Sequence, residues 1–296
     1  MAQRQFASGD TSPWNDRFGG AVDGALTISS DTTESPIDAS CSGAAESNSL
    51  SATNGSFAAG QLILIHQSKG DAVGNWELNK IASYTAGTIT TTYPLVNTYT
   101  DSGASQAQVR VLKQYSSVTI DASKTYSPKA WDGDVGGILA FVCSGKVTIA
   151  GIISAFATGW RGGHEGNEQV NVKGASGEGT TGGPGSNDNQ ENVNMPPYGT
   201  GGGGGFGRGA GQAGGGGGGG HATNGGQGGN GGGGAGGTAG NAALTNLVFG
   251  GGGGGGGSAP NNNSSYYAGG GRPGGGIILI IAIQIERTGS GYINID

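Results

Sequence analysis

Glycine makes up more than half of the stretch from Gly199 to Gly276, where it accounts for 41 of 78 residues. Its uninterrupted runs are Gly201–Gly205, Gly214–Gly220, Gly231–Gly234 and Gly250–Gly257. Because glycine has no side chain, these runs cannot build an apolar side-chain core. The stretch is therefore either a flexible low-complexity linker or a region ordered through its backbone alone.

Short inserts between the glycine runs favour the ordered alternative, because several carry apolar or aromatic residues that a linker does not need. These inserts are Phe206–Ala213, His221–Asn230, Ala242–Phe249 and Ser258–Ala268. We expect left-handed extended helices with three residues per turn, paired through N–H and C=O groups. Ordering costs about 1–2 kcal/mol per residue and a hydrogen bond returns about 0.5–1.5, so nearly every backbone group must be bonded.

The remaining sequence predicts strands and no helix. Residues 61–66 form a short apolar run, residues 76–81 and 108–112 alternate, and residues 88–93 are rich in β-branched side chains. Turn signals about every ten residues predict a small barrel or sandwich. Residues 136–142 and 147–153 are weakly echoed by residues 275–281 and 284–289 and by Ile293, which is typical of stacked solenoid coils.

The predicted fold is therefore all-β, with five parts. An N-terminal β-barrel or sandwich-like module spans residues 1–117, and short β-solenoid strands span 118–160. A polar transition covers 161–198, a polyglycine II helix bundle covers 199–276, and a closing strand lies in 277–296. Ile277–Ile285 is apolar on both faces, so we expect it to be buried on both sides, by neighbouring coils or by another chain.

Charge and hydropathy argue against nucleic-acid and membrane partners. The net charge of −6 and pI near 5.0 provide no basic surface for nucleic acid or anionic lipid. The N-terminus lacks the apolar core of a signal peptide, and Ile277–Ile283 is too short to span a bilayer. We expect a soluble chain that reaches the outside by lysis, by another export system or within a virus particle.

Catalytic and metal-binding patterns are not found. His66, His164 and His221 are isolated, and Gly145-Lys146 is followed by Val147, so it makes no phosphate-binding loop. Matches to Gly-x-Gly-x-x-Gly are trivial in so much glycine. Cys41 and Cys143 do not make a disulfide framework, and Cys143 is expected to be a buried thiol. We expect a protein that is not an enzyme and has no cofactor.

Glycine runs joined by aromatic and polar turns resemble the receptor-binding adhesins at the tail-fibre tips of T-even-like bacteriophages. The rest of the chain is similar to a broader group of glycine-rich phage tail and bacterial surface proteins, through residues 57–67 and 76–81, the stretch from Gly136 to Ile153, and the strand entry at Gly275–Ile278. The resemblance implies polyglycine rods whose tip loops contact the host surface.

The predicted function is that of a structural and adhesion protein of a phage tail fibre or similar appendage in the virion. The alternative is an extracellular structural protein that forms a cell-surface filament or adhesin. Expected partners are further copies or other fibre subunits, and a host surface protein or glycan. The candidate contact residues lie in the inserts, and they are Phe206, Arg208, His221, Asn262, Tyr266 and Tyr267. Phe206, Phe249, Tyr266 and Tyr267 are alternatively caps on the ends of the rods.

Overall fold

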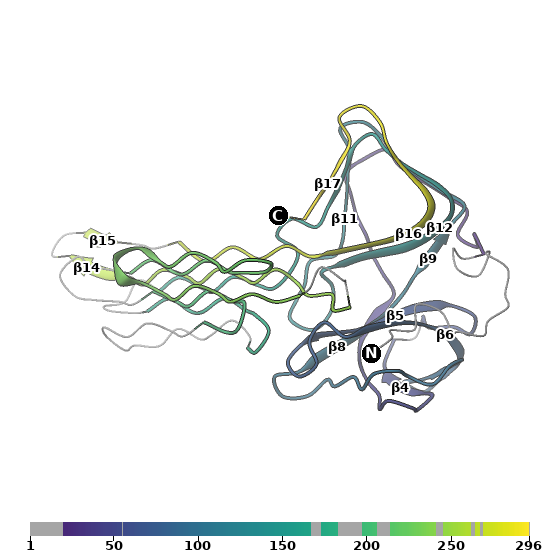
Figure 1. Ribbon diagram of the computed structural model, residues 1–296, viewed down its shortest axis with the longest axis horizontal. Helices are drawn as coiled ribbons and strands as arrows, with labels where there is room; N and C mark the ends of the chain where they lie inside the picture. The colour runs from purple at the N-terminus through teal and green to yellow at the C-terminus, as the bar shows by residue number, and fades with distance from the viewer. Residues whose placement is uncertain are drawn as a thin grey trace.

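The computed structural model describes residues 20–54, 56–166, 173–182, 197–205, 214–240, 245–261, 264–266 and 269–295. These residues form three parts, a barrel, a parallel β-solenoid beside it, and a long glycine-rich lobe that projects to one side (Figure 1). The glycine-rich lobe, called the glycine lobe below, comprises the described residues between 159 and 276.

The barrel confirms the strands expected in the first half of the chain. Six antiparallel strands close in the order β3-β4-β7-β6-β5-β8. Alternate side chains point inward, so that Ile63, Ile65 and Val109 are buried in its core. The bounds are β3 Asp38–Ser42, β4 Ser49–Ala52, β5 Leu62–Lys69, β6 Trp76–Thr85, β7 Thr88–Thr91 and β8 Gln106–Val111.

The solenoid is built from two parallel sheets that stack four coils. One sheet has the order β1-β10-β12-β16, with β9 also paired to β12, and the other has the order β17-β13-β11-β2. Successive coils are therefore β1/β2, β10/β11, β12/β13 and β16/β17. The bounds are β1 Ala25–Ile28, β2 Thr32–Thr33, β9 Lys113–Tyr115, β10 Ser117–Ile120, β11 Thr125–Ser127, β12 Ile138–Ile149, β13 Ile152–Ser154, β16 Ile277–Arg287 and β17 Tyr292–Asn294.

Two insertions interrupt these coils. The barrel is inserted between the first and second coils, and the glycine lobe between the third and fourth. The barrel strand β5 and the solenoid strand β12 are buried on both faces, because Leu64 and Val142 share an apolar cluster between the two parts. Phe141 on the opposite face of β12 fills the solenoid core. This two-sided burial explains why both strands are nearly continuous apolar runs.

The expected bundle of polyglycine II helices is a wrong prediction. The only helical element among the described residues is a short 3₁₀ turn at Gly229–Gly231. The other described glycine runs form neither helix nor strand, and their hydrogen bonds run between segments. The physical reason is that pairing between bare backbones does not require a regular helix, because glycine has no side chain to restrict its backbone conformation.

One central segment, residues 250–257, illustrates how the glycine lobe is held together. Its successive N–H groups donate in turn to three neighbouring segments, residues 269–276, 214–220 and 173–182. From residue 250 to 257, the accepting carbonyl groups belong to Gly275, Gly220, Glu178, Arg272, Gly217, Ala175, Gly269 and Gly214, at 2.8–3.1 Å. The backbones lie so close that a Cβ built on Gly254 would collide with the carbonyl of Gly203.

The far end of the glycine lobe carries a small antiparallel hairpin. Strands β14 (Ala259–Asn261) and β15 (Ser264–Tyr266) pair there, with Ala259 opposite Tyr266. Figure 1 places this hairpin at the end most distant from the barrel and solenoid. The base of the lobe lies at the opposite end, where residues 247–249 return to the barrel.

Candidate functional site

Aromatic side chains join the base of the glycine lobe to the other two parts. The Phe249 ring lies 5.4 Å from that of Trp131 and 5.7 Å from that of Trp160, with the second pair edge to face. The His66 ring of β5 is also 5.7 Å away. These separations are typical of favourable aromatic packing. Phe249, expected from the sequence as a cap, is buried at the base of the lobe.

Gly137 belongs to the same joint for a steric reason. Its φ of +75° lies in the region that favours glycine, and a Cβ there would collide with the Phe249 ring. The glycine therefore lets the strand entry of β12 approach the aromatic cluster. A larger residue at this position would separate the solenoid from the base of the glycine lobe.

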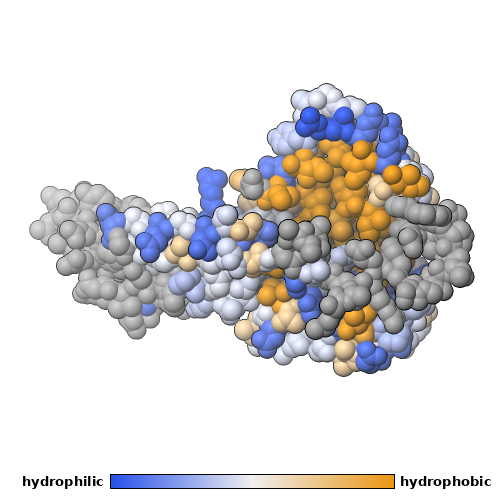
Figure 2. Space-filling model, in the orientation of Figure 1, coloured by the Kyte–Doolittle hydropathy of each residue, from blue (hydrophilic) through white to orange (hydrophobic). Residues whose placement is uncertain are grey.

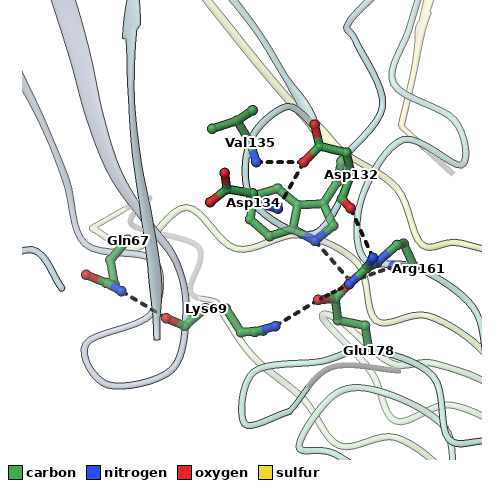
Figure 3. A network of polar contacts seen from close by, with 8 residues as sticks. Gln67, Lys69, Asp132, Asp134, Val135, Arg161 and Glu178 are labelled. Atoms are coloured by element: carbon green, nitrogen blue, oxygen red, sulfur yellow. Dashed lines mark hydrogen bonds and ion pairs between the residues drawn. The ribbon is translucent and has the colours of Figure 1, made fainter. Parts of the chain in front are cut away.

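A buried carboxylate, Glu178, joins all three parts through charged and polar contacts (Figure 3). It lies 2.9 Å from the Lys69 ammonium at the end of β5, and accepts a hydrogen bond of 3.0 Å from the Trp131 indole. The Arg161 backbone N–H and guanidinium also donate to it, at 3.1 and 3.0 Å. Burial raises the pKa of Glu178, but these bonds outweigh burial and hold it below its usual value.

A second buried chain of hydrogen bonds runs through His66. Its Nε2 lies 2.7 Å from the Leu247 carbonyl oxygen in the glycine lobe, and its Nδ1 lies 2.9 Å from the Ser68 hydroxyl. A carbonyl oxygen only accepts, so Nε2 carries the proton and Nδ1 accepts from Ser68. Gln108 donates to Ser68 at 2.8 Å. Burial lowers the pKa of His66 to about 4.

The contact between Ser68 and His66 has the spacing of a nucleophile and its base. Both side chains are buried, however, and the other ring nitrogen, Nε2, donates its hydrogen bond to the Leu247 carbonyl oxygen. The arrangement holds the lobe against the barrel and offers no access to a substrate. Its chemical capacity is therefore structural, as a relay of hydrogen bonds between the barrel and the glycine lobe.

The candidate contact residues fall in different places. His221 is exposed in the turn after residues 214–220, and its Nε2 lies 3.1 Å from the Val248 carbonyl oxygen near the base of the lobe. Tyr266 ends β15 at the far end. The structure thus places these two at opposite ends of the lobe. Phe206, Arg208, Asn262 and Tyr267 lie outside the described residues.

The last solenoid coil leaves one end of the solenoid open. Strands β16 and β17 are the terminal strands of their sheets, with no further strand among the described residues paired beyond them. Figure 2 shows a broad apolar surface over this part of the molecule. We call it the open end, and its exposed large apolar side chains are Ile283, Ile285, Tyr292, Ile293 and Ile295. Within one chain, Ile277–Ile285 is covered by β12 on one side, and the expected burial of its other side by another chain stays a prediction.

A groove of about 600 Å³ lies between the barrel and the solenoid strands β9 and β12. Its lining includes Leu62, Leu78 and Val142, with Lys80 and Tyr93 among its polar and aromatic members. No three His, Cys, Asp or Glu side chains in the described ranges are arranged to hold a metal ion. None of the described helical residues forms a helix long and apolar enough to cross a membrane.

Comparisons with known proteins include a distant structural likeness to a phage protein. No family model matches the chain, and no curated protein matches its sequence. The structure is similar to the Gp54 tailspike of Acinetobacter baumannii bacteriophage AP22, solved in complex with A. baumannii capsular saccharide. The TM-score is 0.23 at 8% identity, over 49% of this chain and 28% of the tailspike chain. The chain thus spans little more than a quarter of the tailspike's length, and a likeness of this size carries no argument about function.

Sequence reasoning missed the residues that join the three parts. Glu178 was one of several acids in a polar stretch, and Lys69 and His66 followed an apolar run without any motif. Their pairing depends on contacts 109 residues apart for Lys69 and Glu178, and 181 apart for His66 and Leu247. The aromatic content of the insert that ends at Phe249 was the one available signal.

Proposed function

We propose that this protein is a structural and adhesion component of a phage virion, in a tail fibre or similar appendage that binds the host surface. The observation that carries the proposal is the glycine lobe, which projects from the barrel and solenoid and ends in the β14–β15 hairpin (Figure 1). Loops held at the end of an ordered scaffold are common sites of recognition. Tyrosine is among the residue types enriched at binding hot spots, and β15 ends at Tyr266.

Two features of the molecule suit an exposed, non-catalytic role. The lobe is held by backbone hydrogen bonds, so its outer turns can vary without loss of a side-chain core. The two cysteines are free and buried, and need no particular redox environment. The partner at the far end would be a protein or glycan of the host surface.

Cell binding tests this proposal. Fluorescently labelled full-length protein is added to a panel of bacterial strains, and bound label is measured as a function of concentration. For a strain that binds, Tyr266→Ala should weaken binding about tenfold, the loss expected for one hot-spot residue. Tyr93→Ala, which changes an exposed tyrosine of the barrel side, should leave binding unchanged. Binding to none of the strains, or equal loss in both variants, would count against adhesion through the lobe.

The second candidate function is an extracellular structural protein that forms a cell-surface filament. The observation that favours it is the free outer edge of β16 and of β17, which are the terminal strands of their sheets among the described residues, because free strand edges can template assembly. Electron microscopy of the purified protein separates the two candidates. Long regular filaments would support the second, and discrete particles would support the first.

A further inference from the structure

The open end exposes side chains that the previous coil buries. Val147 and Ile285 are register partners, as are Ile153 and Ile293. Val147 and Ile153 are fully buried in the solenoid core, whereas Ile285 is 49% exposed and Ile293 is 48% exposed. Partners in a parallel ladder point to the same side of the sheet. Ile285 and Ile293 therefore point to the core side of their sheets. They are exposed because no further coil stacks on the last one among the described residues.

The backbone of β16 is incomplete at the same place. The Ile277 N–H donates to the Gly137 carbonyl oxygen on the side of β12. Hydrogen-bonding groups alternate sides along a strand of a parallel sheet, so those of Ile278, Ile280 and Ala282 face the free edge. Unpaired groups beside an exposed apolar surface favour pairing with another strand. The partner that suits this surface is thus another β-strand with a free edge and a row of aliphatic side chains.

We propose that a second copy of this chain covers the open end, through its own β16 and β17. The second copy presents the same free edge and the same ladder, so one two-fold contact completes both solenoids. Residues 277–283 carry no charge, and the charged residues of β16, Glu286 and Arg287, lie at one end. Antiparallel pairing of the two β16 strands places these charged ends at opposite limits of the contact. No like charges then face one another.

The glycine lobe does not obstruct this contact. It projects along the longest axis of the molecule, and the open end faces the viewer in Figure 2, beside the lobe and uncovered by it. Dimers formed this way carry two free lobes. The inference goes beyond adhesion and does not depend on it, since the mass of the particle and its binding to cells are measured separately.

Light scattering coupled to size-exclusion chromatography tests the proposal on the full chain. The wild type should elute at twice the 28.8 kDa chain mass. The double variant Ile285→Lys and Ile293→Lys should elute as a monomer at the same concentration, because it places two charged groups where the contact buries aliphatic side chains. The matched control is Val22→Lys, which changes an exposed apolar residue preceding β1 at the other edge of the sheet, and it should remain a dimer.

A backbone variant guards against loss of folding as the cause. Ala282→Pro removes an N–H that faces the free edge and leaves the β12 ladder in place. It should also be monomeric, with an unchanged circular dichroism spectrum. A wild type that stays monomeric, a dimer unaffected by both open-end variants, or a different protein bound at this edge would each overturn the proposal.

Discussion

Glu178 shows how a single buried charge can organise a chain with few charged residues. It is fully buried, and its partner Lys69 has only 4% of its side chain exposed. A buried ion pair contributes little net stability compared with an apolar pair, but removing one partner leaves the other charge uncompensated. The buried position of Glu178 in the glycine lobe therefore depends on Lys69 in the barrel, and the buried position of Lys69 depends on Glu178.

Replacing Glu178 tests this dependence. Glu178→Gln should lower the free energy of unfolding by about 3–5 kcal/mol, since it leaves the Lys69 ammonium buried without a counter-charge. The measurement is chemical denaturation followed by tryptophan fluorescence, because Trp131 contacts Glu178. The double variant Lys69→Met and Glu178→Gln should regain part of the loss. A double variant as unstable as the single one would show that the charge pair is not the cause.

Because burial lowers the pKa of His66, we expect the stability of the folded protein to fall in mild acid. The unfolded chain takes up a proton at this residue near its ordinary pKa of 6.5, whereas the folded chain does so only near 4. Between these values the unfolded state binds more protons, so stability is intact above pH 6.5 and declines as the pH falls toward 4. The loss is about 3 kcal/mol over this window.

Denaturation curves between pH 7 and 4 measure this effect. His66→Gln should flatten the dependence on pH, whatever it does to stability at pH 7. His164→Gln, at an exposed histidine of the glycine lobe, should leave the slope of the wild type. If the two variants show the same slope, the buried histidine does not account for acid sensitivity.

At the scale of the element, the close spacing of backbones makes glycine necessary at particular positions. A Cβ on Gly217 would collide with the Gly234 carbonyl, and one on Gly254 with that of Gly203. Valine at either position should destabilise the lobe by about 2–4 kcal/mol through overlap and lost hydrogen bonds. Gly226 has no atom within 4 Å of its Cβ position, so Gly226→Val is the matched control. Thermal unfolding of the three variants should rank the control closest to wild type.

The strands of the barrel could be predicted because their patterns are local. The alternation in β6 and the apolar run in β5 indicate strands by themselves, and the run at Ile277–Ile285 indicated β16. The parallel pairing of Ala25–Ile28 with Ser117–Ile120 joins segments on either side of the barrel in the sequence, and no local pattern indicates it. The expected helix bundle was wrong because the glycine composition indicates only that backbones pair with one another. It does not determine which conformation the paired backbones adopt. The joint at Glu178 and His66 could not be predicted, because it depends on that same long-range pairing.

At the scale of the whole molecule, the two insertions have different positions and roles. The solenoid carries both, and the barrel packs on the outer face of β12 where the glycine lobe begins. The aromatic cluster and Glu178 therefore set the direction in which the lobe projects (Figure 1). An adhesion role requires this direction to persist in solution, with the lobe behaving as an ordered arm.

The central claim is that hydrogen bonds between bare backbones keep the glycine lobe ordered. Amide hydrogen exchange of the full-length protein, followed for the segments at residues 214–220 and 250–257, tests it most directly. Because every N–H in residues 250–257 donates to a neighbouring segment, we predict protection comparable to that of β12 in the solenoid. Exchange of these glycines at the rate of an unstructured peptide, while β12 stays protected, would contradict the account.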